Sequence, residues 1–477
     1  MGYLERIDSY KDEMLKALAE SVAAPSVKSD PVKTKDGELL PFGAGVHEAL
    51  LQMLAKGKEL GFDIYNDDNY AGHIEWKSEN GGDDYFGIVG HLDVVPVGSG
   101  WATDPFEMVD KGDGFVYGRG TSDDKGPVVA SLYALKALRE EGFKPKMNIR
   151  VVLGLDEESG DISAEHYTEH CGHPALGFTP DADFPLVNGE MGILVFDLAR
   201  KFSVKPGKDD LRLSKLEGGT AHNAVPAYAK AVIAGSKDQY DLIADRANLF
   251  CEETGYKLKT KKQGSSLVIE AFGTAAHGAH PDLGLNAVSI LMAFLGNISF
   301  TNEELNDFIA FYNDNIGFDL HGERMGCFFE DGPSGPLIFN VGVAIINEDI
   351  ATVSVNIRYP VSCTDDHVLK GIESVLEGTP VGIVTRMVQK PLYKDLDDPM
   401  VIEYMKAYID ETGDSEAQPM TIGGGTYAKM FNNILAFGAQ FPEDENTMHQ
   451  ADEKFSIESF MKMTRVYARA IAALCCE

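Results

Sequence analysis

The sequence predicts an α/β fold in which a mostly parallel sheet, covered by helices on both faces, is interrupted by an inserted α+β domain. Three observations support this prediction. Up to about residue 191, short apolar runs alternate with helical stretches, which is typical of parallel sheets. From 192 to 388, strands with alternating polarity predominate, which indicates antiparallel pairing. The 477 residues are also too many for one hydrophobic core. We therefore expect a first domain of residues 1–191 and 389–477, and an inserted domain of residues 192–388.

The elements of the first domain follow from apolar spacing. Residues 3–23 and 45–61 have apolar side chains near helical spacing and are predicted as amphipathic helices. Residues 85–89 form an apolar run that predicts a buried strand with His91 at its carboxyl end. Residues 127–138 predict a helix with a proline near its first turn.

A second buried strand is predicted at residues 148–155, and it ends at Asp156-Glu157-Glu158. In open parallel sheets, ligands bind beyond the carboxyl ends of the strands. The histidine after the first strand and the acids after the second are therefore expected at the edge of the sheet where ligands bind.

The pattern of predicted strands and helices changes at about Gly192. Strands are predicted at 193–198, 267–272 and 352–358, and helices near 285–296 and 364–377. We expect the chain to return to the first domain after residue 388. This is because His449 must lie near the first sheet if it joins His91 at one metal site.

Composition excludes several classes of function. The net charge of −33 argues against nucleic acids or anionic membranes as partners. No run of 18 apolar residues occurs, and the first residues lack an apolar signal core. The six cysteines are scattered without a CxxC pair, so neither a zinc ribbon nor a disulfide framework is indicated. A reducing cytoplasm is the expected location.

Five short segments carry side chains that bind metals, and four of them contain glycine or proline. They are Gly90-His91-Leu92-Asp93, Gly118-Arg119-Gly120-Thr121-Ser122-Asp123-Asp124-Lys125-Gly126, Asp156-Glu157-Glu158-Ser159-Gly160, Pro180-Asp181 and Met448-His449-Gln450. Together they provide ligands for two divalent metal ions and leave one carboxylate to act on water.

Each residue type suits a particular task. A neutral imidazole such as His91 binds zinc, and its second nitrogen could face the carboxylate of Asp93. The two oxygens of Asp123 could bridge two cations. Adjacent acids on a turn point in different directions, so one of Glu157 and Glu158 could bind metal while the other polarises water. Taken singly, such acid pairs are usually solvated turns or helix caps.

Other candidates concern the substrate. His277 is interpreted as a hydrogen-bond donor to an anion, whereas His222 and His280 are interpreted as structural or surface residues. Arg358 at a strand end is either a surface ion pair or a clamp for a carboxylate. The loop Gly423-Gly424-Gly425-Thr426 is not followed by the GKS/T of a nucleotide loop, but its free amides could bind a substrate carboxylate.

These segments resemble the dinuclear-metal exopeptidases and deacylases, a family that includes aminoacylase, acetylornithine deacetylase, succinyl-diaminopimelate desuccinylase and the glutamate carboxypeptidases. The family pattern is Gly-His-x-Asp-x-Val-Pro, then Gly-Arg-Gly-x-x-Asp-x-Lys-Gly, a Glu-Glu pair, an Asp and a late His, and all five pieces are present. The chain also resembles the bacterial Xaa-His dipeptidase branch of this family, with supporting matches at residues 101–106, 218–226 and 423–429.

The resemblance implies a role for each matching residue. One zinc ion would be held by His91 and Asp181, the other by Glu158 and His449, and Asp123 would bridge them. The remaining roles are the general base (Glu157), the orienting aspartate (Asp93), stabilisation of the tetrahedral intermediate (His277) and binding of the substrate's terminal carboxylate (Arg358 and Asn223). It further implies a cis peptide bond between Asp123 and Asp124. Lys429 departs from the family, because an arginine is common there.

The sequence therefore predicts a metal-dependent dipeptidase that acts on dipeptides with free termini. It would use two divalent ions, zinc being expected and manganese or cobalt also compatible with the ligands, and it would act as a monomer. An N-acyl amino acid deacylase shares the same motifs, although an insertion as long as 192–388 favours the dipeptidase. A non-catalytic relative would be expected to lack the base or a ligand, yet Glu157 and every ligand position are intact.

Overall fold

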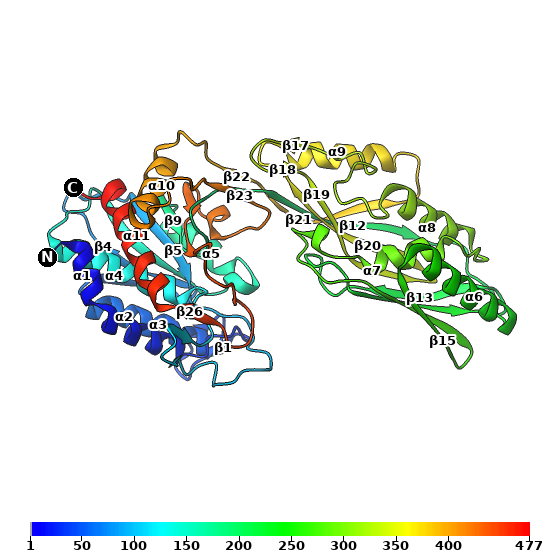
Figure 1. The fold of residues 1–477 in the computed structure, drawn as a ribbon, viewed down its shortest axis with the longest axis horizontal. Helices are drawn as coiled ribbons and strands as arrows, with labels where there is room; N and C mark the ends of the chain where they lie inside the picture. Colours follow the sequence, from blue (N-terminus) through cyan, green and yellow to red (C-terminus); the bar gives the residue numbers. More distant parts are fainter. Residues whose placement is uncertain (1) are drawn as a thin grey trace. The chain divides into compact units, whose positions relative to one another are not determined.

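The structure is a computed structural model that describes residues 2–477, and these residues form two compact units (Figure 1). Unit 1 comprises the chain up to Gly189 together with Tyr393–Thr421 and Gly425–Glu477. Unit 2 comprises Glu190–Leu392 and the short segment Ile422–Gly424. Unit 1 is thus discontinuous in sequence, whereas unit 2 is almost one continuous stretch.

The main sheet of unit 1 has nine strands in the order β22-β11-β24-β9-β5-β8-β4-β3, with β23 paired to β11. The four strands from β24 to β8 are mutually parallel, whereas β4 and β3 pair antiparallel at one side and β11 pairs antiparallel with β24 at the other. The predicted α/β class is confirmed, with antiparallel pairing added at the edges. The strands are β3 (Asp63–Asp67), β4 (Ala71–Trp76), β5 (Tyr85–His91), β8 (Asn148–Gly154), β9 (Leu176–Thr179), β11 (Val187–Glu190), β22 (Leu392–Tyr393), β23 (Met420–Ile422) and β24 (Ile434–Ala436).

Smaller strands complete unit 1. They form one three-stranded sheet, β26-β7-β6, and two two-stranded pairs, β1 with β2 and β10 with β25. Their bounds are β1 (Val32–Lys33), β2 (Leu39–Leu40), β6 (Val109–Asp110), β7 (Phe115–Tyr117), β10 (Ala182–Asp183), β25 (Ala439–Gln440) and β26 (Lys454–Ser456).

One of the helices predicted for unit 1 is interrupted in the structure. The single helix expected over 3–23 is two helices, because the chain turns at Tyr10, whose backbone N–H donates to the carbonyl of Ile7. The Tyr10 hydroxyl donates to Glu140 at 2.5 Å and so anchors this turn. The helices are α1 (Tyr3–Ser9), α2 (Lys11–Val22), α3 (Ala44–Glu59), α4 (Lys125–Glu141), α5 (Ile162–Cys171), α10 (Pro399–Thr412) and α11 (Ile457–Cys475).

Helix α4 forms the centre of the unit 1 helical layer. Nearly all of its residues from Lys125 to Leu138 are buried, because α4 packs against α1, α2, α11 and strand β5. In Figure 1 the red helix α11 lies beside α4, so the end of the chain covers a helix that forms early in the sequence. This burial fixes the loop that leads into α4, which contains Asp123.

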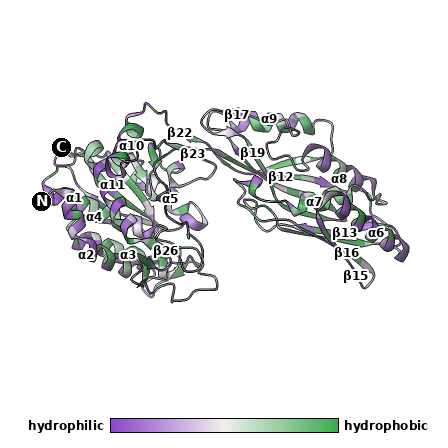
Figure 2. Ribbon diagram, viewed as in Figure 1, coloured by the Kyte–Doolittle hydropathy of each residue, from purple (hydrophilic) through white to green (hydrophobic). Residues whose placement is uncertain are grey.

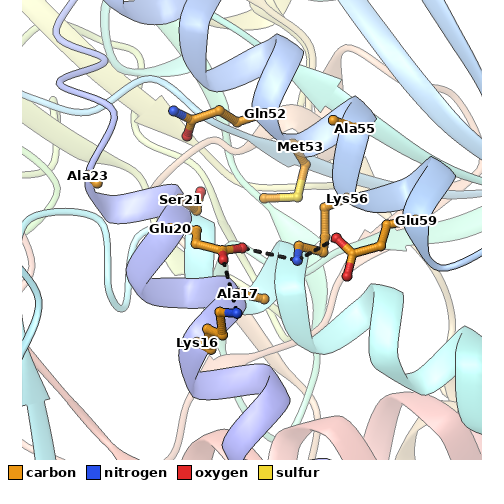
Figure 3. A pocket seen from close by; sticks show the side chains of 10 residues that line it. All are labelled: Lys16, Ala17, Glu20, Ser21, Ala23, Gln52, Met53, Ala55, Lys56 and Glu59. Atoms are coloured by element: carbon orange, nitrogen blue, oxygen red, sulfur yellow. Dashed lines mark hydrogen bonds and ion pairs between the residues drawn. The ribbon is translucent and has the colours of Figure 1, made fainter.

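Helices α2 and α3 border a groove that is unrelated to the predicted site (Figure 3). Its charged side chains pair with one another: Lys56 Nζ lies 3.0 Å from Glu20 and 2.9 Å from Glu59. None of the residues predicted to bind metal or substrate lines this groove.

Unit 2 contains one eight-stranded antiparallel sheet in the order β15-β16-β14-β13-β19-β20-β12-β21. The strands predicted at 193–198, 267–272 and 352–358 are confirmed as β12, β16 and β20. The strands are β12 (Gly192–Lys201), β13 (Arg212–Gly218), β14 (Tyr228–Ala234), β15 (Lys257–Gln263), β16 (Ser266–Phe272), β19 (Ile338–Asn347), β20 (Ile350–Tyr359) and β21 (Gly382–Gln389), with a separate pair, β17 (Glu330–Asp331) and β18 (Gly335–Pro336).

The helices of unit 2 bury the apolar face of this sheet. The strands are coloured predominantly hydrophobic in Figure 2, whereas helices such as α6 and α8 show both colours. One continuous core contains side chains from the sheet and from all four helices. The helices are α6 (Lys237–Thr254), α7 (Ala287–Leu295), α8 (Glu303–Asn315) and α9 (Asp365–Leu376).

A glycine at the start of β12 tests the packing of this core. A Cβ at Gly192 would lie 2.0–2.5 Å from the buried ring of Tyr359, so we expect Gly192→Ala to reduce the free energy of unfolding by about 1–3 kcal/mol through overpacking. Thermal and urea unfolding measure this loss. Gly332→Ala is the matched control in the same unit, because a Cβ there meets no atom within 4 Å; equal stability of the two variants would contradict the prediction.

Candidate metal centre

The centre is built at the carboxyl end of β5, where the strand ends at His91 as predicted. The backbone N–H of His91 donates to Asp124 Oδ2 at 3.1 Å, and both residues are buried. Gly90 permits this approach, because a Cβ there would lie 2.4 Å from the same oxygen. Asp124 was expected only as part of a loop or a helix cap, yet its carboxylate fixes the backbone that presents His91.

Asp123 lies between the two histidines of the centre. Its Oδ1 is 3.0 Å from His91 Nε2, and its Oδ2 is 2.8 Å from His449 Nε2. The Asp123–Asp124 peptide bond is cis, as the resemblance implied. Each oxygen of one buried carboxylate therefore faces a different imidazole.

Two further carboxylates complete two groups of donors. Asp181 Oδ2 lies 3.6 Å from His91 Nε2, and Glu158 Oε1 lies 3.0 Å from His449 Nε2. Glu157 belongs to the first group, since its ligand atom and those of His91 and Asp181 lie within 4.8 Å of one another. The structure thus brings together all six residues predicted at the metals and the base.

Asp93 supports both halves of the centre. Its backbone carbonyl lies 3.0 Å from His91 Nδ1, and its carboxylate lies 3.4 Å from the same nitrogen. The two carboxylate oxygens accept the backbone N–H groups of Glu157 at 3.1 Å and Glu158 at 3.2 Å. One side chain therefore holds both the first histidine and the short 3₁₀ turn, Glu157–Ser159, that carries the glutamate pair.

The shifted pKa values in the centre indicate that its buried carboxylates need compensating positive charge. Burial, and then the neighbouring Asp123, raise the pKa of Asp181 to about 7. Burial and Asp181 raise the pKa of Glu157 well above its usual range. Hydrogen bonds with Asp123 and Glu158 raise the pKa of His449 to about 10. Because crowded buried carboxylates are costly without cations, and imidazole and carboxylate are donors that zinc accepts, the residues fit a metal centre.

A second buried acid, Glu453, holds the loop that presents Asp123. It pairs with Arg119 at 2.7 Å and also accepts the backbone N–H groups of Gly120 at 3.1 Å and Ser122 at 3.0 Å. Lys125 at the end of the same loop donates to two backbone carbonyls near the end of α2, and burial lowers its pKa to about 7. Glu453 was not predicted from the sequence. Its one signal was Arg119, since a buried arginine needs a carboxylate.

Three of the predicted substrate residues lie together in unit 2. The carbonyl of Asn223 accepts the N–H of Gly278 at 2.7 Å, beside an isolated bridge between Ala224 and His277. His277 Nδ1 accepts the backbone N–H of Ala279 at 3.2 Å, so the neutral ring carries its proton on Nε2. Burial and then the charge of Arg358 lower the pKa of His277, which favours this neutral form.

Arg358 is a buried cation in unit 2. It is 5% exposed, and its Nε has no hydrogen-bond partner among residues 2–477. Burial lowers its pKa to about 10, and within the described part of the chain no carboxylate offsets this effect. Such a guanidinium favours an anion, so the alternative of a surface ion pair is wrong. Of the loop glycines, Gly424 belongs to unit 2 and Gly425 to unit 1.

Comparison with known proteins identifies the family. Residues 87–473 match the model of one protein family, Peptidase family M20/M25/M40. This chain belongs to the M20/M25/M40 peptidase family. It is 36% identical over 476 residues to a Staphylococcus epidermidis protein named "Putative dipeptidase", covering 99% of each chain. A Staphylococcus aureus relative with a similar name is 34% identical over 475 residues, again covering 99% of each.

Solved structures share the fold of this M20/M25/M40 peptidase. Human carnosine dipeptidase 1 superposes with a TM-score of 0.54 at 18% identity, covering 98% of this chain and 97% of that one. Aminoacylhistidine dipeptidase from Vibrio alginolyticus gives 0.54 at 17% identity, covering 96% of both. The resemblance inferred from the motifs is confirmed, and the chain is a peptide-bond hydrolase. Across residues 2–477, the helices are too short or too polar to cross a membrane.

The pairing of Glu453 with Arg119 can be tested by stability. Glu453→Gln removes the charge that compensates a buried guanidinium, so we expect the free energy of unfolding to fall by about 3–5 kcal/mol. Chemical denaturation followed by circular dichroism measures the loss. Glu458→Gln, an exposed glutamate five residues later, should leave stability unchanged. If both variants unfold at the same denaturant concentration, Glu453 does not hold the loop.

Proposed function

We propose that this peptidase is a metal-dependent dipeptidase that uses two divalent ions. The observation that carries the proposal is Asp123, whose two oxygens lie 3.0 Å and 2.8 Å from two different imidazoles. This is the arrangement expected of a carboxylate that bridges two cations. The dipeptidase names of the relatives at 34–36% identity support the choice of substrate class.

The ligand assignment follows from the two donor groups. His91 and Asp181 would hold one ion, His449 and Glu158 the other, and Asp123 both. Zinc suits this mixture of imidazole and carboxylate donors, and manganese or cobalt is also compatible. Bound divalent ions would polarise the scissile carbonyl and lower the pKa of a water molecule.

Glu157 is the proposed general base. Its backbone is fixed by Asp93, and its carboxylate lies beside the donor atoms of His91 and Asp181. From this position Glu157 takes a proton from the attacking water and later gives it to the nitrogen of the leaving amine. The water oxygen forms a bond to the scissile carbon, the C–N bond breaks, and a carboxylate and an amine leave.

Residues outside the metal centre are proposed to bind the substrate. His277 donates from Nε2 to the oxyanion of the tetrahedral intermediate. Arg358 binds the α-carboxylate of the dipeptide, together with Asn223 and the amides of Gly424 and Gly425. Acidic groups take the free amino end. The deacylase alternative shares this chemistry, but none of the relatives reported above is named as a deacylase.

We further propose that the enzyme acts as a monomer in the cytoplasm. The sheet of unit 2 can be divided into two four-stranded halves, β15-β16-β14-β13 and β19-β20-β12-β21. Each half includes a hairpin followed by a helix, α6 in one and α9 in the other. Two such halves in one chain would replace a dimer contact and let His277 act on its own metals. The six free cysteines suit a reducing compartment.

The base is tested by Glu157→Gln. Removing general base catalysis should lower kcat by roughly 10²–10⁴-fold while both metals stay bound. Rate assays on a dipeptide panel, with metal analysis of the same samples, measure both quantities. Glu165→Gln on the exposed side of α5 is the control. Near-normal turnover of Glu157→Gln at full metal occupancy would exclude this assignment.

The carboxylate clamp is tested with paired substrates. Arg358→Gln should lower kcat/KM for a free dipeptide by roughly 10- to 100-fold, the value of a charged hydrogen bond. The same dipeptide with an amidated C-terminus should be a poor substrate for both proteins, with little difference between them. Arg324→Gln, an exposed arginine in unit 2, should behave as the wild type. A parallel loss on the amide would mean that Arg358 acts structurally.

Mixing two inactive variants, His277→Ala and Glu157→Gln, tests whether the catalytic histidine comes from the same chain as the metals or from a partner chain. If each chain supplies its own histidine, the mixture stays inactive, because no chain has both residues. Activity that reappears on mixing would show that the histidine comes from a partner chain, and the monomer proposal would fall.

A further inference from the structure

A second cluster of metal-binding side chains lies in unit 1, outside the centre described above. It consists of Asp67, the last residue of β3, and two histidines one helical turn apart on α5, His166 and His170. None of the proposed catalytic or substrate residues belongs to it. Residues four apart on a helix lie on the same face, so α5 presents both imidazoles to the end of β3.

The three donor atoms form a compact triangle. His166 Nδ1 lies 2.9 Å from Asp67 Oδ2, and His170 Nδ1 lies 3.4 Å from the same oxygen. The two Nδ1 atoms are 3.1 Å apart. Neighbouring ligands of a tetrahedral zinc ion are about 3.3 Å apart when the metal–ligand distance is about 2.0–2.1 Å. The triangle therefore has nearly the dimensions of one face of a zinc coordination shell.

The orientation of the imidazoles is difficult to explain by hydrogen bonds alone. If both Nδ1 atoms carried protons, two N–H groups would oppose each other across 3.1 Å. If only His166 donates to Asp67, the Nδ1 of His170 points a lone pair at that carboxylate, 3.3 Å from Oδ1. A cation at the centre of the triangle satisfies all three atoms at once.

The surrounding residues fix Asp67 and His166 in place, whereas the side of the cluster at His170 is open to solvent. Asp67 is 2% exposed, and among residues 2–477 its ion pairs are with these two histidines. The ring of Tyr70 stacks on that of His166 at a centroid distance of 4.1 Å and an angle of 7°, which fixes the imidazole plane. The side chain of His170 is 47% exposed, so an ion can enter and a water molecule can take the fourth position.

We propose that Asp67, His166 and His170 bind one divalent transition-metal ion, of which zinc is the representative, separately from the dinuclear centre. Two imidazoles and one carboxylate select such ions over calcium or magnesium. The ion joins the hairpin of β3 and β4 to helix α5.

This link has a consequence for the catalytic turn. In the first turn of α5, the N–H of Ser163 donates to Asp156 at 2.9 Å, and the Ser163 hydroxyl accepts the N–H of Leu155 at 3.0 Å. These bonds tie α5 to the residues immediately before Glu157. A metal that fixes α5 therefore stabilises the segment that carries the glutamate pair, without contact with the substrate.

The first experiment counts zinc. Wild type, His166→Ala, His170→Ala and Glu169→Ala are loaded with Zn²⁺, freed of loosely bound metal by gel filtration and analysed by mass spectrometry for zinc per chain. The two histidine variants should each contain one zinc fewer than the wild type. Glu169→Ala, an exposed neighbour on the same helix, should contain as much zinc as the wild type. Equal zinc in wild type and His170→Ala overturns the proposal.

A second experiment removes the dinuclear centre from the measurement. In a His91→Ala/Asp123→Ala/His449→Ala background, which lacks both imidazoles and the shared carboxylate of the dinuclear centre, Zn²⁺ titration should still show one bound ion and a rise in Tm. Adding His170→Ala should abolish both effects, whereas adding Glu169→Ala should preserve both. A triple variant that binds no zinc overturns the proposal. The result does not depend on whether the substrate is a dipeptide, because no substrate is used.

Discussion

The candidate centre depends on one buried carboxylate shared between two imidazoles. Asp123 is 4% exposed, and it meets His91 from the end of β5 and His449 from the last part of the chain. A carboxylate in this position cannot be neutralised by water, so its neighbours must carry the compensating charge. A histidine lies on each side of the carboxylate, and the divalent cations proposed above would supply the remaining positive charge.

The surrounding acids are stabilised mainly by backbone amides. Asp93 accepts two N–H groups of the glutamate turn, Asp124 accepts that of His91, and Glu453 accepts two from the loop before Asp123. Amide donors stabilise a carboxylate while also fixing the course of the main chain. In this protein the same negative charges that favour metal therefore also set the positions of the residues that bind it.

Sequence reasoning recovered what depends on local pattern. The apolar runs identified β5 and β8, and their carboxyl ends located His91 and the glutamate pair. It did not recover Glu453, which lies 334 positions from Arg119 in the chain, because no local pattern links two residues so distant. The break at Tyr10 was missed for the same reason, since Glu140 on α4 holds the tyrosine hydroxyl. The Asp67 cluster also depends on a strand and a helix that meet only in the fold.

The discontinuity of unit 1 has a consequence for how the protein is made. Unit 2 is almost continuous, and a ribosome that has released residues up to Leu392 has supplied nearly all of its sheet. Unit 1 must wait for α11, which covers α4, and for His449. Because chains emerge from the amino end at roughly 5–20 residues per second, unit 2 can fold for several seconds beside an unfinished first unit. The candidate metal centre is therefore assembled only after residue 449 has emerged, later than the sheet of unit 2.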